Sequence, residues 1–246
     1  MLFKMKIKIL YEDSNILAID KPSGVLTVPD QRTEKPTVFD YFKKKYPKLE
    51  LVHRLDKETS GVMLLAKNEK AHEFLKEQFT DRTINKVYNA IVSGHVKNDR
   101  GIINKPIGRS PKDFRRRLAG RGARGELREA ITEYKVLKRI TTPGPLLHKE
   151  GRVSSPPAKG EWPKAEGVNF TLLEIKPKTG RTHQIRVHMK FINHPVACDT
   201  LYNPNGPCPK GLSRLALHAK SIEFANLSGK IIKVESPLPR IFSKIK

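Results

Sequence analysis

Short apolar runs separated by polar turns fill the first third of the chain. Residues 7–11 and 15–19 are rich in isoleucine and leucine, and a polar turn at 12–14 lies between them. This pattern predicts a β-hairpin. The continuous apolar run at 61–66 predicts a buried strand, and 85–92, where polar and apolar residues alternate, predicts a half-buried strand.

Helical spacing is found at three places. Residues 37–46 form a short segment with an aromatic face, and 68–79 repeats apolar residues every three or four positions. The second pattern is typical of an amphipathic helix. The segment 178–188 places a glycine turn before residues that we also expect to form a helix.

The rest of the chain predicts strands at 130–139, 168–175 and 215–219, and further strands between 221 and 234. Residues 141–167 are rich in proline, glycine, serine and lysine and show no sustained period, which indicates a long flexible loop. The strands and helices together favour a mixed α+β fold without fixing a strand order. We expect a single domain over residues 1–246, with the loop as an insertion.

The charge of the chain indicates the kind of partner that it binds. Lysine and arginine number 48 against 25 acidic residues, which gives a formal net charge of +23. Such a balance is typical of a protein that binds a polyanion, here a nucleic acid. The longest apolar run, 61–66, is far shorter than the roughly 20 residues of a membrane-spanning helix, and the first residues lack the apolar block of a secretory signal.

Two cysteines, Cys198 and Cys208, are too few for a disulfide framework. Their spacing relative to His194 and His218 matches no zinc pattern. We therefore expect no metal and two reduced thiols, as is usual in a reducing compartment, and a cytoplasmic location.

An arginine- and glycine-rich stretch at 114–128 concentrates positive charge. We expect its glycines to make it flexible, and its arginines to close on RNA phosphates rather than to form only a solvated loop. The arginines are Arg115, Arg116, Arg117, Arg121, Arg124 and Arg128.

The segment 53–61 carries the first candidate chemistry, because Asp56 stands among cations. His53, Arg54 and Lys57 surround it in sequence, so its ionised form should be favoured. Such a carboxylate is a ready nucleophile or base and a poor proton donor. The alternative is a surface turn with a salt bridge.

The segment 178–188 carries the second set of residues with candidate chemistry. The first turn of the expected helix exposes amide groups that suit an anion. Arg186 lies four residues beyond Thr182, on the same face of the helix.

Three segments, in this order, resemble the RluA-type RNA pseudouridine synthases from about residue 6 to the end of the chain. They are His-Arg-Leu-Asp at 53–56 with Thr-Ser-Gly at 59–61, Lys-Val-Tyr-Asn-Ala at 86–90 with Gly94, and Gly-Arg-Thr-His-Gln-Ile-Arg-Val-His at 180–188. His-Pro at 194–195 and Leu-His-Ala at 217–219 follow downstream. Together they make a specific signal.

The sequence departs from the family pattern in three respects. The loop 141–167 is longer and richer in proline than we expect, and Ala197-Cys198-Asp199 stands where a glycine more often precedes the aspartate. We expect neither to touch the catalytic residues. No N-terminal extension for a small S4-type RNA-binding domain is visible, so RNA affinity should come from the charge of the catalytic domain or from a partner.

The resemblance implies a pseudouridine-synthase-like α+β domain with a largely antiparallel central sheet, flanked by helices and loops, and a cleft that holds Asp56. The activity it implies is isomerisation of uridine in structured RNA, which breaks the bond from uracil N1 to the ribose and rebuilds it through C5. This reaction needs no cofactor. Asp56 would be the essential carboxylate, by attack at the sugar, attack at C6, or removal of the C2′ proton.

By the same resemblance, Arg186 would be the buried ion-pair partner that holds both oxygens of Asp56. Tyr88 would pack against the uracil and handle the C5 proton, unless it is a strand residue that faces the core. Arg54 would fill the gap that the extruded uridine leaves. Leu217 would form pocket wall or plain core, and Arg181 would pair with phosphate. The remaining substrate-side residues, His53 and Gln184, would brace the loops with His183 and His188.

Two other functions remain open at this stage. A basic RNA-binding or ribosome-associated protein without catalysis fits the charge equally well, but phosphate binding alone does not require the set Asp56, Tyr88 and Arg186. A glycosylase or hydrolase would use Asp56 with water and usually a second acid, for which only Glu58 is near. We expect a monomer acting on a stem-loop of ribosomal or transfer RNA.

Overall fold

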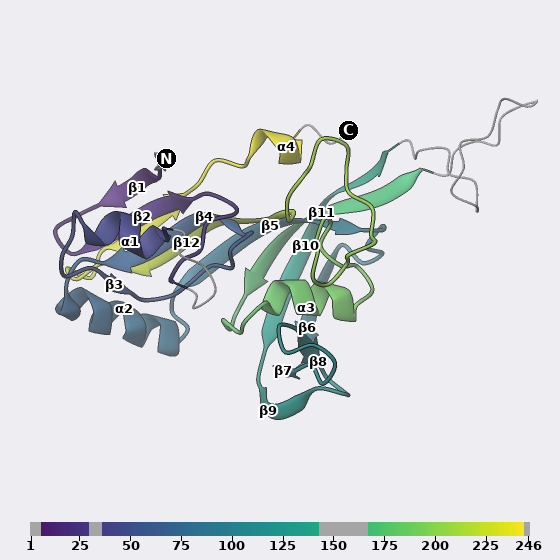
Figure 1. The fold of residues 1–246 in the computed structure, drawn as a ribbon, viewed down its shortest axis with the longest axis horizontal. Helices are drawn as coiled ribbons and strands as arrows, with labels where there is room; N and C mark the ends of the chain where they lie inside the picture. Colours follow the sequence, from purple (N-terminus) through teal and green to yellow (C-terminus); the bar gives the residue numbers. More distant parts are fainter. Residues whose placement is uncertain (1–5, 30–35, 143–166, 244–246) are drawn as a thin grey trace, which may run out of the picture.

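A long twisted sheet of ten strands runs through the molecule (Figure 1). The computed structural model describes residues 6–29, 36–142 and 167–243. In order across the sheet the strands are β1 (Lys8–Glu12), β2 (Ile16–Lys21), β4 (Ser60–Ala66), β12 (Leu217–Ala225), β5 (Asn85–Ser93), β11 (Val168–Pro177), β10 (Ile131–Thr142) and β6 (Arg100–Asn104), with β13 (Ile231–Glu235) paired to β12 and β3 (Glu50–Leu51) to β4.

Within the described residues the sheet is antiparallel except between β4 and β12, which run parallel. The α+β class and the largely antiparallel sheet are therefore confirmed. The parallel pairing joins segments more than 150 residues apart, His218 opposite Ser60 and Ala219 opposite Gly61. Gly61 has φ of 111°, and a Cβ there would lie 2.1 Å from the carbonyl oxygen of Ala219. Only glycine allows this approach.

The helices agree with the sequence pattern. They are α1 (Val38–Lys43), α2 (Glu69–Thr80), α3 (Gln184–Phe191) and the short α4 (Arg240–Ser243). Thr37 and Asp40 form a reciprocal capping box at the start of α1, and the Asn68 side chain accepts from Ala71 N at the start of α2. Both caps satisfy amide groups that have no partner inside the helix.

Strand β4 is buried along its whole length, and its side chains alternate between two cores. Val62 and Leu64 pack in the cluster that contains Leu75 of α2. Met63 and Leu65 pack in the cluster that contains Phe42 of α1. A strand fixed on both faces gives a rigid base to the loop that precedes it, and that loop contains Asp56.

The arginine- and glycine-rich stretch is more ordered than the sequence predicted. With residues before it, it forms a three-stranded antiparallel sheet of β7 (Ile107–Arg109), β8 (Arg117–Ala119) and β9 (Arg124–Arg128), which we call the arginine sheet. Gly120, Gly122 and Gly125 have positive φ of 71°, 85° and 72°. Gly120 and Gly122 therefore shape the turn between β8 and β9, and Gly125 lies within β9, where the register with β7 shifts.

Two further expectations concern the segments that connect neighbouring strands. The strands on either side of the proline-rich loop, β10 and β11, form an antiparallel pair, while 143–166 lie outside the described residues. The further strands expected between 221 and 234 are the end of β12 and the start of β13, and Asn226 makes the turn between them by accepting from the amides of Ser228 and Lys230.

The expectation of two reduced thiols is wrong for this structure, in which Cys198 and Cys208 form a disulfide. The loop between them brings their Cα atoms to 5.1 Å, within the range that a disulfide spans. Nothing in the spacing of the two residues indicated this loop. None of the helices in the described part of the chain has the length and apolar character needed to cross a lipid bilayer.

Candidate active site

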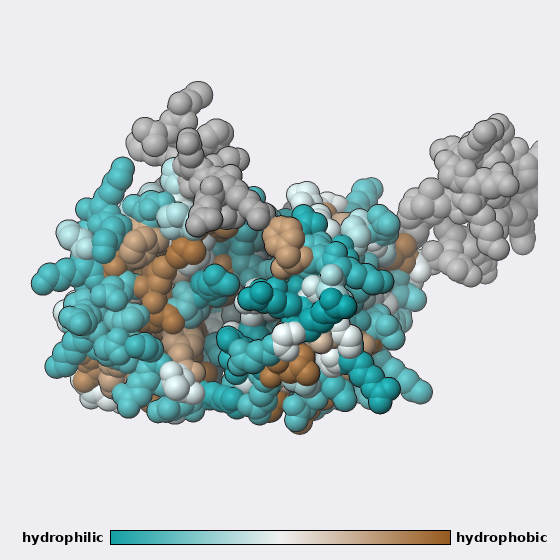
Figure 2. All heavy atoms as spheres, turned by 60° about the horizontal axis from the view of Figure 1, so that its bottom comes forward, coloured by the Kyte–Doolittle hydropathy of each residue, from teal (hydrophilic) through white to brown (hydrophobic). Residues whose placement is uncertain are grey.

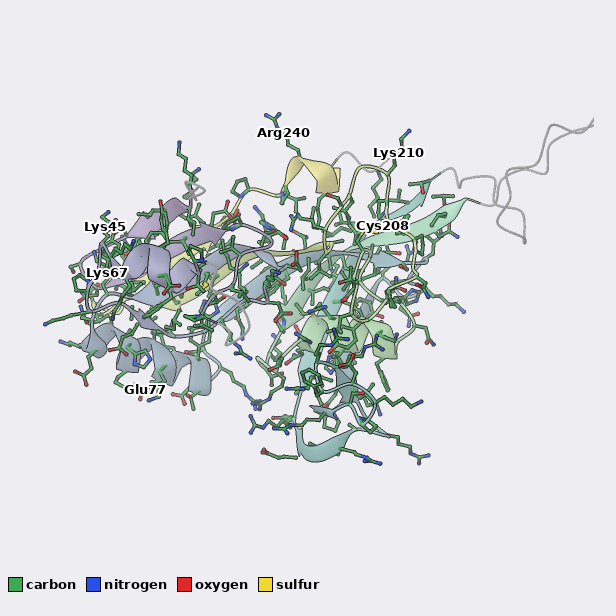
Figure 3. All side chains as sticks on the ribbon, viewed as in Figure 1. Lys45, Lys67, Glu77, Cys208, Lys210 and Arg240 are labelled. Atoms are coloured by element: carbon green, nitrogen blue, oxygen red, sulfur yellow. A yellow bond between two sulfur atoms is a disulfide. The ribbon has the colours of Figure 1, made fainter. Side chains whose placement is uncertain are left out.

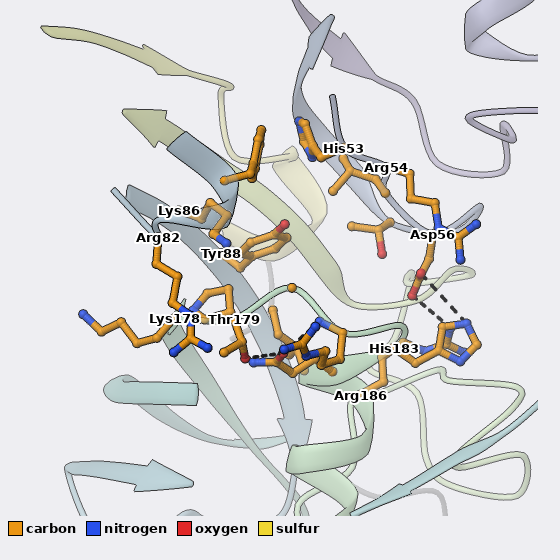
Figure 4. Close-up of a pocket in the computed structure, with 18 of the residues that line it drawn as sticks. His53, Arg54, Asp56, Arg82, Lys86, Tyr88, Lys178, Thr179, His183 and Arg186 are labelled. Carbon is orange, nitrogen blue, oxygen red and sulfur yellow. Dashed lines mark hydrogen bonds and ion pairs between the residues drawn. The ribbon is translucent and has the colours of Figure 1, made fainter. Parts of the chain in front are cut away.

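A cleft of about 620 Å³ opens between the loop before β4 and the turn before α3 (Figure 4). Its walls come from four distant parts of the sequence: residues 52–59, the end of α2 with β5, residues 177–186, and Leu217 at the start of β12. The lining is strongly basic and contains one carboxylate, Asp56.

Asp56 lies on the loop between β3 and β4, at the meeting point of two predicted segments. Its Oδ2 lies 3.2 Å from Nη1 of Arg186, and its Oδ1 lies 3.9 Å from Nε2 of His183. The side chain of Asp56 remains 26% exposed, whereas that of Arg186 is 8% exposed. Arg186 thus holds the carboxylate on its buried side, and its exposed side remains open to a ligand.

Arg186 binds a second carboxylate more tightly than it binds Asp56. Its Nε and Nη2 donate to the two oxygens of Asp199 at 2.7 and 2.8 Å. Burial alone would lower the pKa of Arg186, but the hydrogen bonds and charge of Asp199, with the charge of Asp56, raise it. Arg186 stays charged, and its plane is set by a two-point contact.

This arrangement corrects two expectations. Arg186 does not hold both oxygens of Asp56, since its Nε and Nη2 bind Asp199 and its one hydrogen bond to Asp56 runs from Nη1 to Oδ2. Asp199 does touch the catalytic set, although we expected the segment 197–199 to be remote from it. Asp199 is fully buried, and its Oδ1 also accepts from the amides of Leu201 and Tyr202. In sequence it is an isolated aspartate after a cysteine.

Lys21 is the second functional residue that sequence reasoning missed. It is fully buried at the end of β2, and its ammonium group donates to the carbonyl oxygens of Pro22, Lys57 and Thr59 at 2.9, 3.0 and 2.9 Å. Burial lowers its pKa to about 7, against the opposing charge of Asp56. Two of these carbonyls belong to Lys57 and Thr59, which follow Asp56 in the chain, so Lys21 holds the loop from inside.

Neighbours of Lys21 hold the same loop. Thr27 Oγ1 donates to the Leu55 carbonyl at 2.9 Å, and Ser23 Oγ donates to the Glu58 carbonyl at 2.7 Å. The backbone of the Asp56 loop is thus bound at successive carbonyls by residues 21–27. This pattern fixes the position of the carboxylate more firmly than its own side-chain contacts do.

Tyr88 lies on β5 with its ring on the cleft wall, facing the Asp56 loop (Figure 4). Burial, and after it the charge of Asp56, raises the pKa of Tyr88. The phenol therefore stays protonated near neutral pH. Tyr88 is half-buried, which leaves part of its ring accessible to a ligand. A strand residue that only faced the core would be fully buried.

The other predicted residues divide into those that face the cleft and those that brace it. Arg54 is exposed at the rim, and Leu217 is buried in the wall. Arg181 lines the cleft and donates from Nε to the carbonyl of Glu129 at 2.9 Å. These three positions are compatible with contacts to a ligand.

His53 and Gln184 are held within the protein. His53 Nε2 accepts from Leu64 N at 2.9 Å, and burial, with a smaller effect of the Lys86 charge, lowers the His53 pKa to about 3. The Gln184 amide is fully used: its oxygen accepts from Thr179 and Arg181, and its nitrogen donates to Ile131 and Thr132. Both side chains brace the loops of the cleft.

Basic side chains are widely distributed over the surface. Lys45 and Lys67 project at one end of the sheet, and Lys210 and Arg240 project along the edge that carries α4 (Figure 3). The face that carries the arginine sheet is mostly hydrophilic, with separate hydrophobic patches (Figure 2). Phe114 and Leu127, at 69% and 50% exposed, are the apolar side chains that the arginine-rich region presents to solvent.

Comparisons with known proteins agree with this geometry. A family model described as RNA pseudouridylate synthase matches residues 15–191. The dual-specificity RNA pseudouridine synthase RluA of Vibrio vulnificus is 35% identical over 218 residues, which cover 88% of this chain and 77% of that protein. The ribosomal large subunit pseudouridine synthase D of Borreliella burgdorferi is 34% identical over 247 residues, which cover 96% and 66%.

Solved structures show the same fold. Human RNA pseudouridylate synthase domain containing 1 superposes with a TM-score of 0.72 at 24% identity, over 95% of this chain and 84% of that one. Human RNA pseudouridylate synthase domain containing 4 gives a TM-score of 0.67 at 26% identity, over 96% and 90%.

Proposed function

Because this chain belongs to the RNA pseudouridylate synthase family and is an RNA pseudouridine synthase, we propose that Asp56 is the carboxylate with which it isomerises uridine. One observation carries the proposal: among the residues that the structure describes, Asp56 is the single carboxylate that lines the basic cleft, and it is both ion-paired and exposed. A hydrolase with two acidic groups is not favoured, because Glu58 does not line the cleft.

The role of Arg186 is to aim the carboxylate. Asp199 fixes the guanidinium plane through two hydrogen bonds, and Nη1 then holds Oδ2 of Asp56 at 3.2 Å. The exposed side of the carboxylate is left to meet the substrate. This orientation serves attack at the sugar, attack at C6 and removal of the C2′ proton equally well, since each begins from the anion.

Tyr88 would receive the flipped base. A stacked uridine cannot reach Asp56 while it is inside an RNA helix, so the base must be extruded into the cleft. Stacking on an aromatic ring is worth about 1–3 kcal/mol per base. Because its phenol stays protonated, Tyr88 offers a hydrogen-bond donor beside the base and can handle the C5 proton only by exchange through a neighbouring group.

Arg54 and the cations of the rim would hold the RNA. The exposed Arg54 guanidinium is placed to fill the gap that the extruded base leaves. Arg82, Lys178 and Arg181 line the same opening and suit phosphate oxygens. We propose that the substrate is a stem-loop of ribosomal or transfer RNA and that the enzyme acts as a monomer in the cytoplasm. The name of the Borreliella burgdorferi relative supports the ribosomal substrate.

Release of tritium from RNA that carries 5-³H-uridine tests the proposal. The parent protein and an Asp56→Asn variant are incubated with ribosomal and transfer RNA transcripts, and a Glu58→Gln variant serves as a control in the same loop. We expect release by the parent and by Glu58→Gln, and none by Asp56→Asn. Equal release by Asp56→Asn would refute the role of Asp56. Binding of every transcript without release by any of the three proteins would favour a non-catalytic RNA-binding protein.

A further inference from the structure

Three hydrogen-bonding groups form a chain from the arginine sheet to the second oxygen of Asp56. The backbone N–H of Arg117, on β8, donates to the Tyr202 hydroxyl at 2.8 Å. The same hydroxyl lies 2.9 Å from Nδ1 of His183. The opposite ring nitrogen of His183, Nε2, lies 3.9 Å from Oδ1 of Asp56.

The Tyr202 hydroxyl decides which nitrogen of His183 carries the proton. A phenol has one proton to donate, and an amide N–H can only donate. Since the hydroxyl oxygen accepts from Arg117, its own proton needs an acceptor, and among the described residues His183 Nδ1 is the one within hydrogen-bond distance. Nδ1 is therefore the acceptor, and the proton of a neutral His183 must lie on Nε2.

Both rings are held in place. Tyr202 is 2% exposed, and its ring meets the His183 ring edge to face at a centroid distance of 5.6 Å. The guanidinium of Arg186 lies over the Tyr202 ring at 5.0 Å, and Asp199 binds the Tyr202 amide. Hydroxyl and imidazole thus have little freedom to exchange partners.

The backbone conformation of His183 is one that residues other than glycine rarely adopt. His183 precedes α3 with φ of 57° and ψ of 19°, in the left-handed region, and its side chain does not cap the helix. Residues other than glycine seldom adopt this conformation, and asparagine does so more readily than histidine or glutamine. The strain places the imidazole between Tyr202 and Asp56.

We propose that His183 is a positioning residue that directs its Nε2–H at Oδ1 of Asp56, and that Tyr202 enforces the tautomer that makes this possible. This inference rests on the proposed role of Asp56. At 3.9 Å the two atoms are not yet hydrogen-bonded, and a shift of about 1 Å in the carboxylate closes the bond. Arg186 then holds one oxygen of Asp56 and His183 the other.

A neutral imidazole suits this task. Burial lowers the pKa of His183, although the charge of Asp56 opposes the shift. An uncharged donor orients the carboxylate without adding a second full positive charge to that of Arg186, so the carboxylate keeps more of its reactivity.

The tautomer is measured directly by two-bond ¹H–¹⁵N correlation spectra of protein labelled with ¹⁵N-histidine, at a pH where His183 is neutral. We expect the Nε2–H pattern in the parent and a mixture of both tautomers in Tyr202→Phe, which keeps the ring and loses the hydroxyl. Tyr134→Phe is the control, because no hydrogen bond of the Tyr134 hydroxyl is found among the described residues. An Nδ1–H pattern in the parent, or an unchanged pattern in Tyr202→Phe, overturns the proposal.

Two substitutions at position 183 test the position of the donor. Glutamine places an amide N–H near the site of Nε2, whereas asparagine places one near the site of Nδ1. We expect kcat of His183→Gln at saturating RNA to exceed that of His183→Asn by about tenfold, the value of one charge-assisted hydrogen bond, with similar KM. Asparagine suits the backbone better, so a merely structural role predicts the opposite order, and that order would refute the inference.

The failures of the two proposals are distinguishable. If Asp56→Asn keeps full activity, the proposed role of Asp56 fails, whatever the spectra show. If Asp56→Asn is inactive while His183→Asn equals or exceeds His183→Gln, the role of Asp56 stands and the inference about His183 fails.

Discussion

The base of the cleft and the arginine sheet use charged residues in opposite ways. At the base, Lys21, Arg186 and Asp199 are buried, and their partners come from distant parts of the chain. In the arginine sheet, the ion pairs join close sequence neighbours on the surface. Examples are Arg115 with Asp113 and Arg128 with Glu126.

This difference indicates two tasks. A buried charge is costly unless its geometry is complete, so a complete network holds its groups at fixed positions. Exposed pairs contribute little to stability and can be exchanged for phosphate oxygens. We therefore expect the base of the cleft to set the rate of reaction and the arginine sheet to set the affinity for RNA.

The largest effect should follow from Asp199→Ala, which breaks the buried network. Removing one partner of a buried ion pair costs about 3–5 kcal/mol, because the other charge loses its compensation. We expect a loss of this size in the free energy of unfolding, measured with urea, and loss of tritium release. Asp113→Ala, which breaks surface pairs in the arginine region, is the matched control. If both variants are equally stable, the contrast between the two regions is wrong.

The second effect concerns Lys21. In Lys21→Met the side chain keeps its length and loses its three donors, which leaves buried carbonyl oxygens without partners at a cost of about 1–3 kcal/mol. Because two of these carbonyls lie in the loop directly after Asp56, we also expect kcat to fall with little change in RNA affinity. Lys57→Met, at an exposed lysine of the same loop, is the control. An unchanged kcat in Lys21→Met would show that the loop is positioned without it.

Substitutions in the arginine sheet should weaken RNA binding and leave kcat unchanged. Arg121 and Arg124 are exposed, and among the described residues neither has a carboxylate within ion-pair distance. We expect the double variant Arg121→Ala/Arg124→Ala to bind RNA about tenfold more weakly, with kcat at saturating RNA unchanged. The slope of log affinity against log salt should fall by about 0.7–0.9 for each RNA phosphate that the variant no longer neutralises.

The double variant needs a control for the loss of charge alone. Lys230→Ala/Lys233→Ala removes two charges near the turn between β12 and β13, outside the arginine sheet. Equal weakening by both double variants would mean that total charge, and not the arginine sheet, sets the affinity.

The last effect is a pH dependence that originates at the brace of the cleft and is absent at neutral pH. His53 has a folded pKa of about 3 against an ordinary value of 6.5. The unfolded chain therefore binds more protons than the folded one between these values, and stability falls as the pH drops from about 6.5 toward 3, by at most about 1.4 kcal/mol per pH unit.

His53→Gln keeps an acceptor for Leu64 N and removes the titration. We expect its melting temperature to fall less steeply than that of the parent between pH 6.5 and 4.5. His72→Gln, at a histidine on the exposed side of α2 whose partners are the surface carboxylates Glu50 and Glu73, is the control. Parallel curves for the parent and His53→Gln would show that the buried imidazole does not contribute.

Much of the fold follows from local pattern. The hairpin of β1 and β2, the buried strand β4 and the amphipathic helix α2 were predicted near their observed bounds, because alternation and helical spacing report burial within one element. The arginine sheet was missed, since β7 and β8 are only three residues long and β9, which is exposed along its whole length, carries no apolar alternation. Their pairing depends on glycine turns whose φ angles only the folded chain reveals.

The candidate site was predicted in part. Asp56, Tyr88 and Arg186 could be chosen because each lies in a distinctive segment, and the structure places all three on one cleft. Lys21 and Asp199 could not be chosen, because their importance comes from burial and from contacts that only the folded chain makes, Lys21 with distant carbonyls and Asp199 with Arg186. A lysine at the end of a strand and an aspartate after a cysteine look like ordinary surface residues.

The sequence by itself determined the class of fold, the basic character of the protein and the segments that carry its chemistry, because composition and periodicity act over short distances. The tertiary structure alone decided which oxygen of Asp56 faces Arg186, which carboxylate takes the arginine fork, and which nitrogen of His183 meets the Tyr202 hydroxyl. These depend on atoms that the sheet brings together from residues 21, 56, 117, 186 and 199–202. The direction of a hydrogen bond is a property of that assembled geometry, which no single segment contains.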